Sequence, residues 1–298
     1  PAAVEMLDLD EYDLVISSSH CAVKSVIVRG DARHICYCHS PMRYAWDQFD
    51  AYFGPDQVGV LKSFALRPVM AALARWDAAT AGRVDRFLAN SQYVAGRIRR
   101  YYNRRSTVVY PPVDTEFYRP DPGRARSGAG ALVVSALVPY KRLDLAIEAC
   151  RRARVPLQIV GQGPEESRLR RLADGADVEF LGWRTDEEIR ALYQAASVVL
   201  LPGTEDFGIV PVEAQACGTP VVALAAGGSL ETVIDGVTGE LVPEGDAEAF
   251  ADAIRRVLDR RPDATEIRRH AERFSVSRFK ADFAAAVDDT PVHAAVAS

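Results

Sequence analysis

Residues 202–214 read Pro-Gly-Thr-Glu-Asp-Phe-Gly-Ile-Val-Pro-Val-Glu-Ala. They follow the apolar run 198–201 and lead into a segment of helical character, which predicts a strand, a loop and a helix, the repeating unit of α/β folds. Gly208 allows a bend, and Pro211 suits a first helical turn. Glu205 in the loop and Glu213 on the helix can then face different parts of one ligand. Alternatively, Glu213 caps or pairs within its own helix and Glu205 is a solvated loop residue.

Outward from this stretch, apolar runs alternate with helical segments. Six strands are predicted in the second half of the chain, with helices after the first five: 131–136, 157–160, 178–181, 198–201, 220–223 and 239–242. Six such strands predict a doubly wound parallel sheet, which binds ligands beyond the carboxyl ends of its strands.

The first half shows the same alternation with fewer strands. Four are predicted: 13–17, 34–38, 86–89 and 107–109. A helix around 92–102 has Asn90 or Ser91 available to cap its start. A region rich in Pro and Gly follows, which places a domain boundary after residue 118, between a first domain at 1–118 and a second that begins at 119.

Two further loops of the second half contain candidate binding residues. Lys141 and Arg142 come just before a predicted helix, where cations are unfavourable, so an anionic ligand is expected there. Gly161 and Gly163 lack side chains and could let a ligand approach the backbone. A dinucleotide fingerprint needs another glycine where Glu166 stands, and no Walker-type phosphate loop is present, so hydride transfer loses most of its support.

The composition is that of an ordinary globular protein: 298 residues, 48% hydrophobic and 26% charged, with a net charge of -5. No apolar stretch is long enough for a membrane span. Five cysteines fit reduced core thiols, and no ligand spacing predicts a metal site. Residues 60–125 are basic, with their densest arginine run at 97–105. They predict peripheral contact with an anionic membrane or a phosphorylated substrate, or else a solvated helix face, and no nucleic acid.

Three motifs together resemble the C-terminal domain of retaining glycosyltransferases of family 4, which have the GT-B architecture. They are Glu-Asp-Phe-Gly-Ile-Val-Pro-Val-Glu-Ala at 205–214, Val-Pro-Tyr-Lys-Arg at 138–142, and Gly-Gln-Gly-Pro at 161–164. In the first half, Tyr-Asp-Leu-Val-Ile-Ser-Ser-Ser-His at 12–20 and Cys-Tyr-Cys-His-Ser-Pro-Met-Arg-Tyr-Ala-Trp-Asp at 36–47 resemble the mannosyltransferase-like branch that builds O-antigen and exopolysaccharide chains. The resemblance extends from about residue 12 to 279.

The resemblance implies an α/β GT-B fold with two Rossmann-like domains facing a cleft: the second, at 119–274, binds the donor, and a final helix with tail, 275–298, returns to the first domain. It implies transfer of a hexose from a nucleotide-diphosphate sugar, such as GDP-mannose, to a glycan or lipid-linked saccharide, with no cofactor and no metal. The expected location is the cytoplasm, at the inner face of the membrane.

The resemblance also implies a role for each matching residue. Lys141, with Arg142, would neutralise the donor diphosphate, Glu205 would face the transferred sugar, and Glu213 would bind the ribose. His39 would reach the donor sugar from the first domain. Other positions would line the donor site: Gly161, Gly163, Trp183 through nearby backbone, Asp206, Phe207, Gly208 and Ile209.

Two features depart from the family pattern. Ala136 stands where many members have arginine, which leaves Lys141 and Arg142 as the cations for the diphosphate. The first domain also has only four predicted strands and begins at Pro1, so it is expected to be truncated at its N-terminus. Two alternatives therefore stay open: a non-catalytic module that binds nucleotide sugar, and a GT-B enzyme that uses a sugar phosphate.

Overall fold

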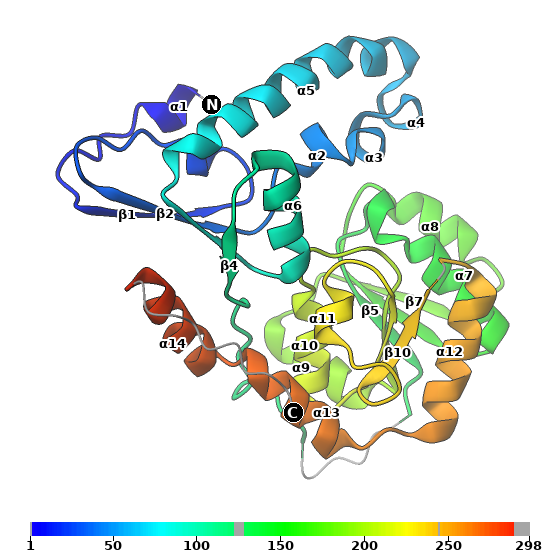
Figure 1. Cartoon of the computed structure of the whole chain (residues 1–298). Coiled ribbons are helices and arrows are strands. Elements are labelled where there is room, and N and C mark those ends of the chain that lie inside the picture. Colours follow the sequence, from blue (N-terminus) through cyan, green and yellow to red (C-terminus); the bar gives the residue numbers. More distant parts are fainter. Residues whose placement is uncertain (1, 122–127, 244, 289–298) are drawn as a thin grey trace. The chain divides into compact units, whose positions relative to one another are not determined.

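The computed structural model describes residues 2–121, 128–243 and 245–288, which form two units (Figure 1). The first unit comprises Pro1–Tyr110 with Lys280–Ser298, and the second comprises Pro111–Phe279. Composition placed the boundary after residue 118. In the structure residues 111–118 belong to the second unit, because Val113 pairs with Ser275 and its N–H donates to the Phe274 carbonyl at 2.9 Å. The tail from residue 289 lies outside the described residues.

The second unit is built on a six-stranded parallel sheet, as the sequence predicted. Its strands are β5 (Ala131–Val134), β6 (Leu157–Val160), β7 (Val178–Gly182), β8 (Val198–Leu201), β9 (Val221–Leu224) and β10 (Gly239–Val242). Their order is β10-β9-β8-β5-β6-β7, so the winding direction reverses between β5 and β8. In a doubly wound sheet this reversal opens the crevice in which ligands bind.

Helices cover both faces of this sheet, which explains why its strands are nearly continuous apolar runs. One face carries α7 (Leu143–Ala153), α8 (Glu166–Leu172) and α12 (Ala247–Arg260), and α7 and α12 lie side by side (Figure 1). The other face carries α9 (Asp186–Ala195), α10 (Ile209–Ala216) and α13 (Ala264–Ala271). The remaining short elements are η3 (Pro139–Lys141), α11 (Ser229–Thr232) and η4 (Glu272–Phe274).

The first unit has a four-stranded parallel sheet in the order β1-β2-β3-β4. The strands are β1 (Leu14–Ser19), β2 (Arg33–Cys38), β3 (Arg86–Ala89) and β4 (Ser106–Val108). The helices that precede the last strand are α1 (Ala2–Glu5), η1 (Val23–Ser25), α2 (Arg43–Trp46), α3 (Phe49–Phe53), α4 (Pro55–Val58), α5 (Val60–Thr80), η2 (Ala81–Arg83) and α6 (Gln92–Tyr102). Ser91, rather than Asn90, caps α6 by accepting the Val94 N–H at 3.0 Å.

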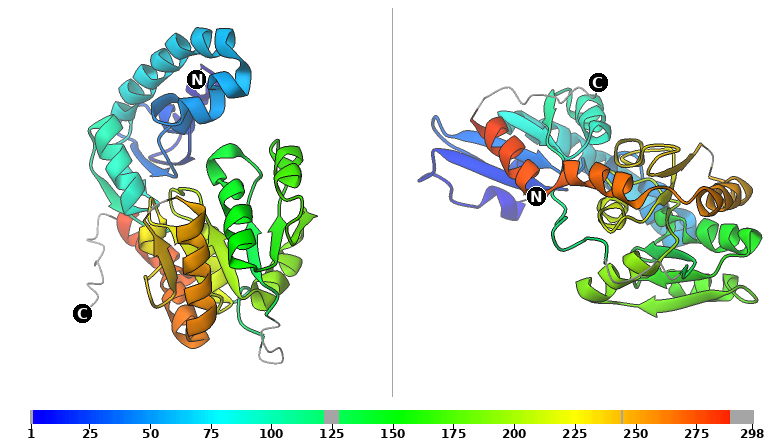
Figure 2. Two further views of the ribbon diagram at one scale, coloured as in Figure 1. Left: turned by 90° about the vertical axis from the view of Figure 1, so that its right-hand side faces the viewer. Right: turned by 90° about the horizontal axis from the view of Figure 1, so that it is seen from below.

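The final helix, α14 (Val276–Val287), starts in the second unit and continues into the first. Its later part lies against the first sheet (Figure 2). There Arg33 donates to the Val287 carbonyl at 2.6 Å, and the Tyr37 and Phe283 rings meet edge to face at 5.9 Å. Segments from the two ends of the chain therefore complete one unit.

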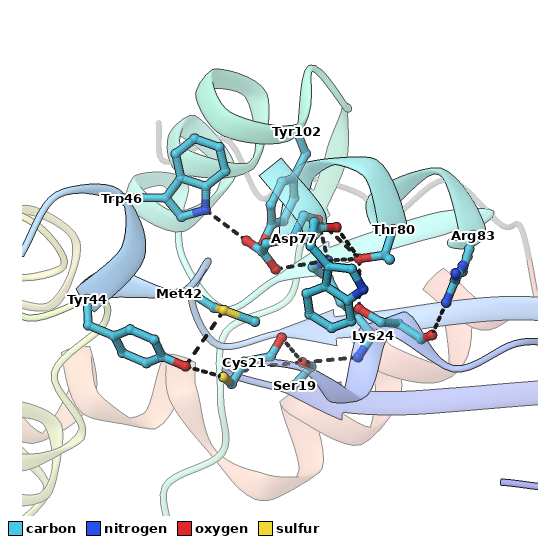
Figure 3. Close-up of polar contacts among 12 residues, drawn as sticks. Ser19, Cys21, Lys24, Met42, Tyr44, Trp46, Asp77, Thr80, Arg83 and Tyr102 are labelled. Carbon is cyan, nitrogen blue, oxygen red and sulfur yellow. Dashed lines mark hydrogen bonds and ion pairs between the residues drawn. The ribbon is translucent and has the colours of Figure 1, made fainter. Parts of the chain in front are cut away.

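A buried ion pair lies beneath the helices of the first unit (Figure 3). Lys24 and Asp77 are 1% and 0% exposed, and their charged atoms are 3.0 Å apart. The second oxygen of Asp77 accepts the Trp46 indole N–H and the Tyr102 hydroxyl, each at 2.8 Å, and Lys24 also donates to Thr80. Burying these two charges costs desolvation energy, and the hydrogen bonds around them offset part of that cost. No local sequence pattern predicts this pair.

All five cysteines are free thiols, and four of them are buried. Within the described ranges, no helix combines the length and the apolar composition needed to cross a membrane.

Candidate functional site

Lys141 and Glu205 meet where the winding of the second sheet reverses. Lys141 follows β5 and Glu205 follows β8, and these two strands are neighbours. The ammonium and the carboxylate form an ion pair, with the side chains 18% and 14% exposed. Two residues that the sequence predicted as site candidates, on separate loops, are thus in contact at the edge where parallel sheets bind ligands.

Glycines allow the loops at this edge to pack backbone against backbone. A Cβ on Gly203 would lie 2.6 Å from the Tyr140 carbonyl oxygen, so the loop after β8 passes directly over the one that carries Lys141. Gly161 and Gly163 likewise touch the loop after β5: a Cβ on Gly161 would lie 1.9 Å from the oxygen of Ser135. The space that these two glycines leave is filled by a neighbouring loop, and this contact accounts for them without a ligand.

The loop from Glu205 to Ile209 contains both buried and exposed residues. The Glu205 carbonyl accepts the Gly228 N–H at 2.8 Å, which fixes the loop to the start of α11. Asp206 and Phe207 are buried, and the Phe207 ring packs edge to face on Phe274 at 5.4 Å. Gly208 takes φ +90 at the start of α10, and Ile209 after it is 45% exposed.

Arg142 has a partner within its own helix turn. It occupies the position before α7 in the left-handed conformation, and its Nε donates to Asp144 at 3.3 Å. With Lys141 paired to Glu205, each of the two cations near this helix start is therefore balanced by a carboxylate of the chain. The electrostatic mismatch that led us to expect an anionic ligand is thus compensated internally, and a diphosphate would share Lys141 with Glu205.

Glu213 lies on α10 in surroundings unlike those of Glu205. The Tyr193 hydroxyl donates to its Oε2 at 2.9 Å, and the Tyr118 hydroxyl bonds to the same carboxylate. Burial raises the pKa of Glu213, and the two hydroxyls oppose that rise. Neither tyrosine was predicted as a site residue, since each reaches Glu213 from a segment distant in sequence.

Two further predicted site residues, Trp183 and His39, belong to other elements. Trp183 follows β7 and is 67% exposed. His39 belongs to the first unit, directly after β2, where its Nε2 hydrogen-bonds the Ser18 hydroxyl at 2.8 Å and its ring meets Tyr37 edge to face. The proposed roles of both residues remain predictions.

Comparison with known proteins gives two family matches that divide the chain between them. Residues 114–274 match the model described as glycosyl transferases group 1, and residues 1–117 match that described as Glycosyltransferase Family 4.

Among curated proteins, the chain is 36% identical over 215 residues to a D-inositol 3-phosphate glycosyltransferase of Mycolicibacterium smegmatis, covering 64% of this chain and 50% of that protein. It is 32% identical over 289 residues to the protein of the same name from Mycobacterium tuberculosis, covering 84% and 60%. The chain thus spans between half and three fifths of the length of these relatives.

Solved structures share the fold. Sucrose-phosphate synthase from Thermosynechococcus elongatus superposes with a TM-score of 0.74 at 21% identity, over 94% of this chain and 74% of that one. HepE from Anabaena, in complex with UDP and glucose, superposes with a TM-score of 0.65 at 20% identity, over 92% and 98%. These likenesses confirm the predicted α/β fold of GT-B type.

Proposed function

We propose that this chain, which belongs to the family of glycosyl transferases group 1, moves a hexose from a nucleotide-diphosphate sugar to a hydroxyl of a glycan or lipid-linked acceptor, with retained anomeric configuration. The contact between Lys141 and Glu205 at the sheet reversal carries this proposal. It places a cation and a carboxylate together on the unit that also holds Glu213.

Stabilisation of the leaving group is the main catalytic effect we propose. Negative charge develops on the diphosphate as the glycosidic bond breaks, and the Lys141 ammonium and nearby helix N-termini favour that charge. Glu205, already bound to Lys141, holds the ammonium in position and faces the sugar. Lys141 supplies the positive charge itself, so we propose a reaction without metal, in which a chelator leaves the rate unchanged.

The sugar we propose is mannose, with GDP-mannose as donor. Support comes from residues 36–47, which resemble the mannosyltransferase-like branch. HepE was solved with UDP and glucose, and the curated relatives are named for inositol phosphate. The panel that tests the donor therefore contains both UDP- and GDP-sugars, and the acceptors include D-inositol 3-phosphate beside lipid-linked glycans.

The decisive assay measures what leaves the donor. The full chain is incubated with GDP-mannose, UDP-glucose, UDP-N-acetylglucosamine and mannose 1-phosphate in turn, with each acceptor, and the products are separated by chromatography. The proposal is supported if nucleoside diphosphate is released and NMR shows that the product keeps the anomeric configuration of the donor. Binding without release supports a non-catalytic module, and turnover only with a sugar phosphate overturns the nucleotide donor.

Peripheral contact of residues 60–125 with an anionic membrane is a further part of this proposal. Not every arginine of the basic run can contribute: Arg97 is buried in an ion pair with Asp47, and Arg104 donates to three backbone carbonyls of the first unit. What supports the contact is the start of α5, where Val60, Leu61 and Phe64 are exposed beside Lys62.

Vesicle sedimentation tests this contact. Apolar side chains beside a cation favour insertion at the surface of anionic lipid. The chain should sediment with vesicles that contain phosphatidylglycerol more than with vesicles of phosphatidylcholine alone, and Phe64→Ser with Lys62→Ser should reduce the difference. Equal sedimentation with both vesicles, or no effect of the substitutions, contradicts the contact.

A further inference from the structure

Two tyrosine hydroxyls converge on the carboxylate of Glu213 from separate segments. Tyr193, on α9, is fully buried, and its hydroxyl lies 2.9 Å from Glu213 Oε2. Tyr118, from the segment that leads into the second unit, hydrogen-bonds the same carboxylate. The two rings meet edge to face with centroids 5.9 Å apart. Each aromatic ring thus supports the other while both hydroxyls point at one acid group.

The position of Tyr118 is itself fixed to the helix that carries Glu213. Its backbone N–H donates to the Asp114 carbonyl at 2.8 Å. Arg268, on α13, donates to the Tyr118 carbonyl at 3.2 Å and to the Ala216 carbonyl, in the last turn of α10, at 2.9 Å. One guanidinium therefore holds the Tyr118 backbone and the end of α10 together.

This arrangement limits how the carboxylate can turn. A carboxylate has roughly four acceptor positions on its two oxygens. The two phenol hydroxyls use about two of these acceptor positions, so the remaining positions can accept hydrogen bonds from further donors, such as the vicinal hydroxyls of a sugar. We propose that Tyr193 and Tyr118 are positioning residues, which hold Glu213 in the orientation that accepts the ribose hydroxyls of the donor. This inference rests on the proposed function.

The charges around Glu213 determine how pH enters the test. Burial raises its pKa most, Asp186 on α9 raises it further, and the two tyrosine hydroxyls lower it. The thiol of Cys217, on the residue after α10, is kept neutral because burial raises its pKa to about 12. Two nearby cations, Arg190 and Arg268, lower the pKa of Cys217 and oppose this rise. Without a phenol donor, Glu213 is protonated more readily and loses part of its capacity to accept.

Calorimetric binding of UDP and GDP to the full chain tests the proposal. Tyr193→Phe and Tyr118→Phe keep the rings and remove only the hydroxyls. For whichever nucleotide the wild type binds, each substitution should weaken binding about tenfold near pH 6 and less near pH 8, because the hydroxyl donates to an ionised group. Unchanged affinity, or the same loss at both pH values, contradicts the proposal.

Tyr102→Phe is the matched control. It also removes a buried hydroxyl from a carboxylate, that of Asp77 in the first unit (Figure 3), and should leave nucleotide affinity unchanged. In a Glu213→Gln background, Tyr193→Phe should add little to the loss, because the two residues act as one group. Additive losses would show that Tyr193 acts independently of Glu213.

A second readout separates this inference from the proposed function. Carbon-13 NMR of the Glu213 carboxyl, recorded without nucleotide, should show a higher pKa in Tyr193→Phe than in the wild type. If the wild type binds no nucleotide, the proposed function fails, and the carboxyl titration still decides whether the tyrosines control Glu213. An unchanged titration overturns the positioning role.

Discussion

Glu205 and Glu213 belong to one loop-helix segment but have different partners. Glu205 forms an ion pair with Lys141, whose ammonium can also interact with a charged ligand. Glu213 instead accepts hydrogen bonds from neutral hydroxyls. We therefore predict that Glu213→Ala weakens nucleotide binding at least tenfold, the scale of about 1.5–3 kcal/mol for a hydrogen bond to a charged group. Glu205→Ala should mainly lower kcat. Calorimetry and steady-state kinetics measure the two effects.

This division of labour has a clear counter-result. If both variants lose the same affinity for the free nucleoside diphosphate, the two carboxylates do not have separate roles. Wild-type turnover in Glu205→Ala would likewise remove Glu205 from the chemistry.

Lys141 allows a prediction with a neighbouring control. Lys141→Ala should cost about 2–4 kcal/mol in kcat/KM, the scale for removal of one electrostatic donor to a developing anion. Arg142→Ala should cost less, since the Arg142 side chain is engaged with Asp144. Equal losses in the two variants would mean that Arg142 binds the diphosphate as well, and an unaffected Lys141→Ala would place the diphosphate elsewhere.

Local patterns identified candidate site residues only where the pattern itself carries chemistry. A carboxylate in a loop after a strand, or a lysine at a helix start, can be recognised from its neighbours in sequence, which is how Lys141, Glu205 and Glu213 became candidates. Tyr118 and Tyr193 contact Glu213 only through tertiary packing. The ion pair of Lys24 and Asp77 likewise joins residues that no short window contains.

At the scale of elements, strands were predicted more completely than helices. Each of the ten predicted strands forms. The central strands of the second sheet are buried on both faces and therefore read as apolar runs. The segment 43–80 carried no such signal. Its longest helix, α5, contains Pro68, which normally interrupts a helix, and exposes apolar side chains in its first turns.

Helix α13 carries a histidine that should make the second unit sensitive to acid. His270 is buried beside Phe274, and desolvation lowers its pKa to about 4. Because the unfolded chain takes up this proton near pH 6.5, the neutral form stabilises the fold above that pH, and the stability is lost as pH falls towards 4. At pH 5 we expect a loss of about 2 kcal/mol relative to pH 7.5.

Urea unfolding of the wild type and of His270→Gln measures this loss. The variant lacks the titrating group, so its stability should fall less between the two pH values. The matched variant at exposed His20, His20→Gln, should behave as the wild type. The same pH dependence in all three proteins would assign the acid sensitivity to other groups.

For the whole molecule, the sequence predicted two α/β units but not where the chain passes between them. The boundary fell within a stretch of proline and glycine, whereas residues 111–118 join the second unit through backbone pairing with Ser275, a contact about 160 residues away in sequence. The second unit alone contains Lys141, Glu205 and Glu213, and the first contains His39. We therefore expect donor binding to depend on the second unit, with turnover depending on both.

A thermal-shift panel of nucleotide sugars on the full chain tests the central claim most directly, because a ligand that binds only the folded state raises its melting temperature. We predict that GDP-mannose or a UDP-hexose raises the melting temperature of the wild type and of His39→Ala, and that Glu213→Ala markedly reduces the rise at the same ligand concentration. If no nucleotide sugar shifts the wild type, or if Glu213→Ala shifts as much, the second sheet does not hold a nucleotide-sugar donor through Glu213.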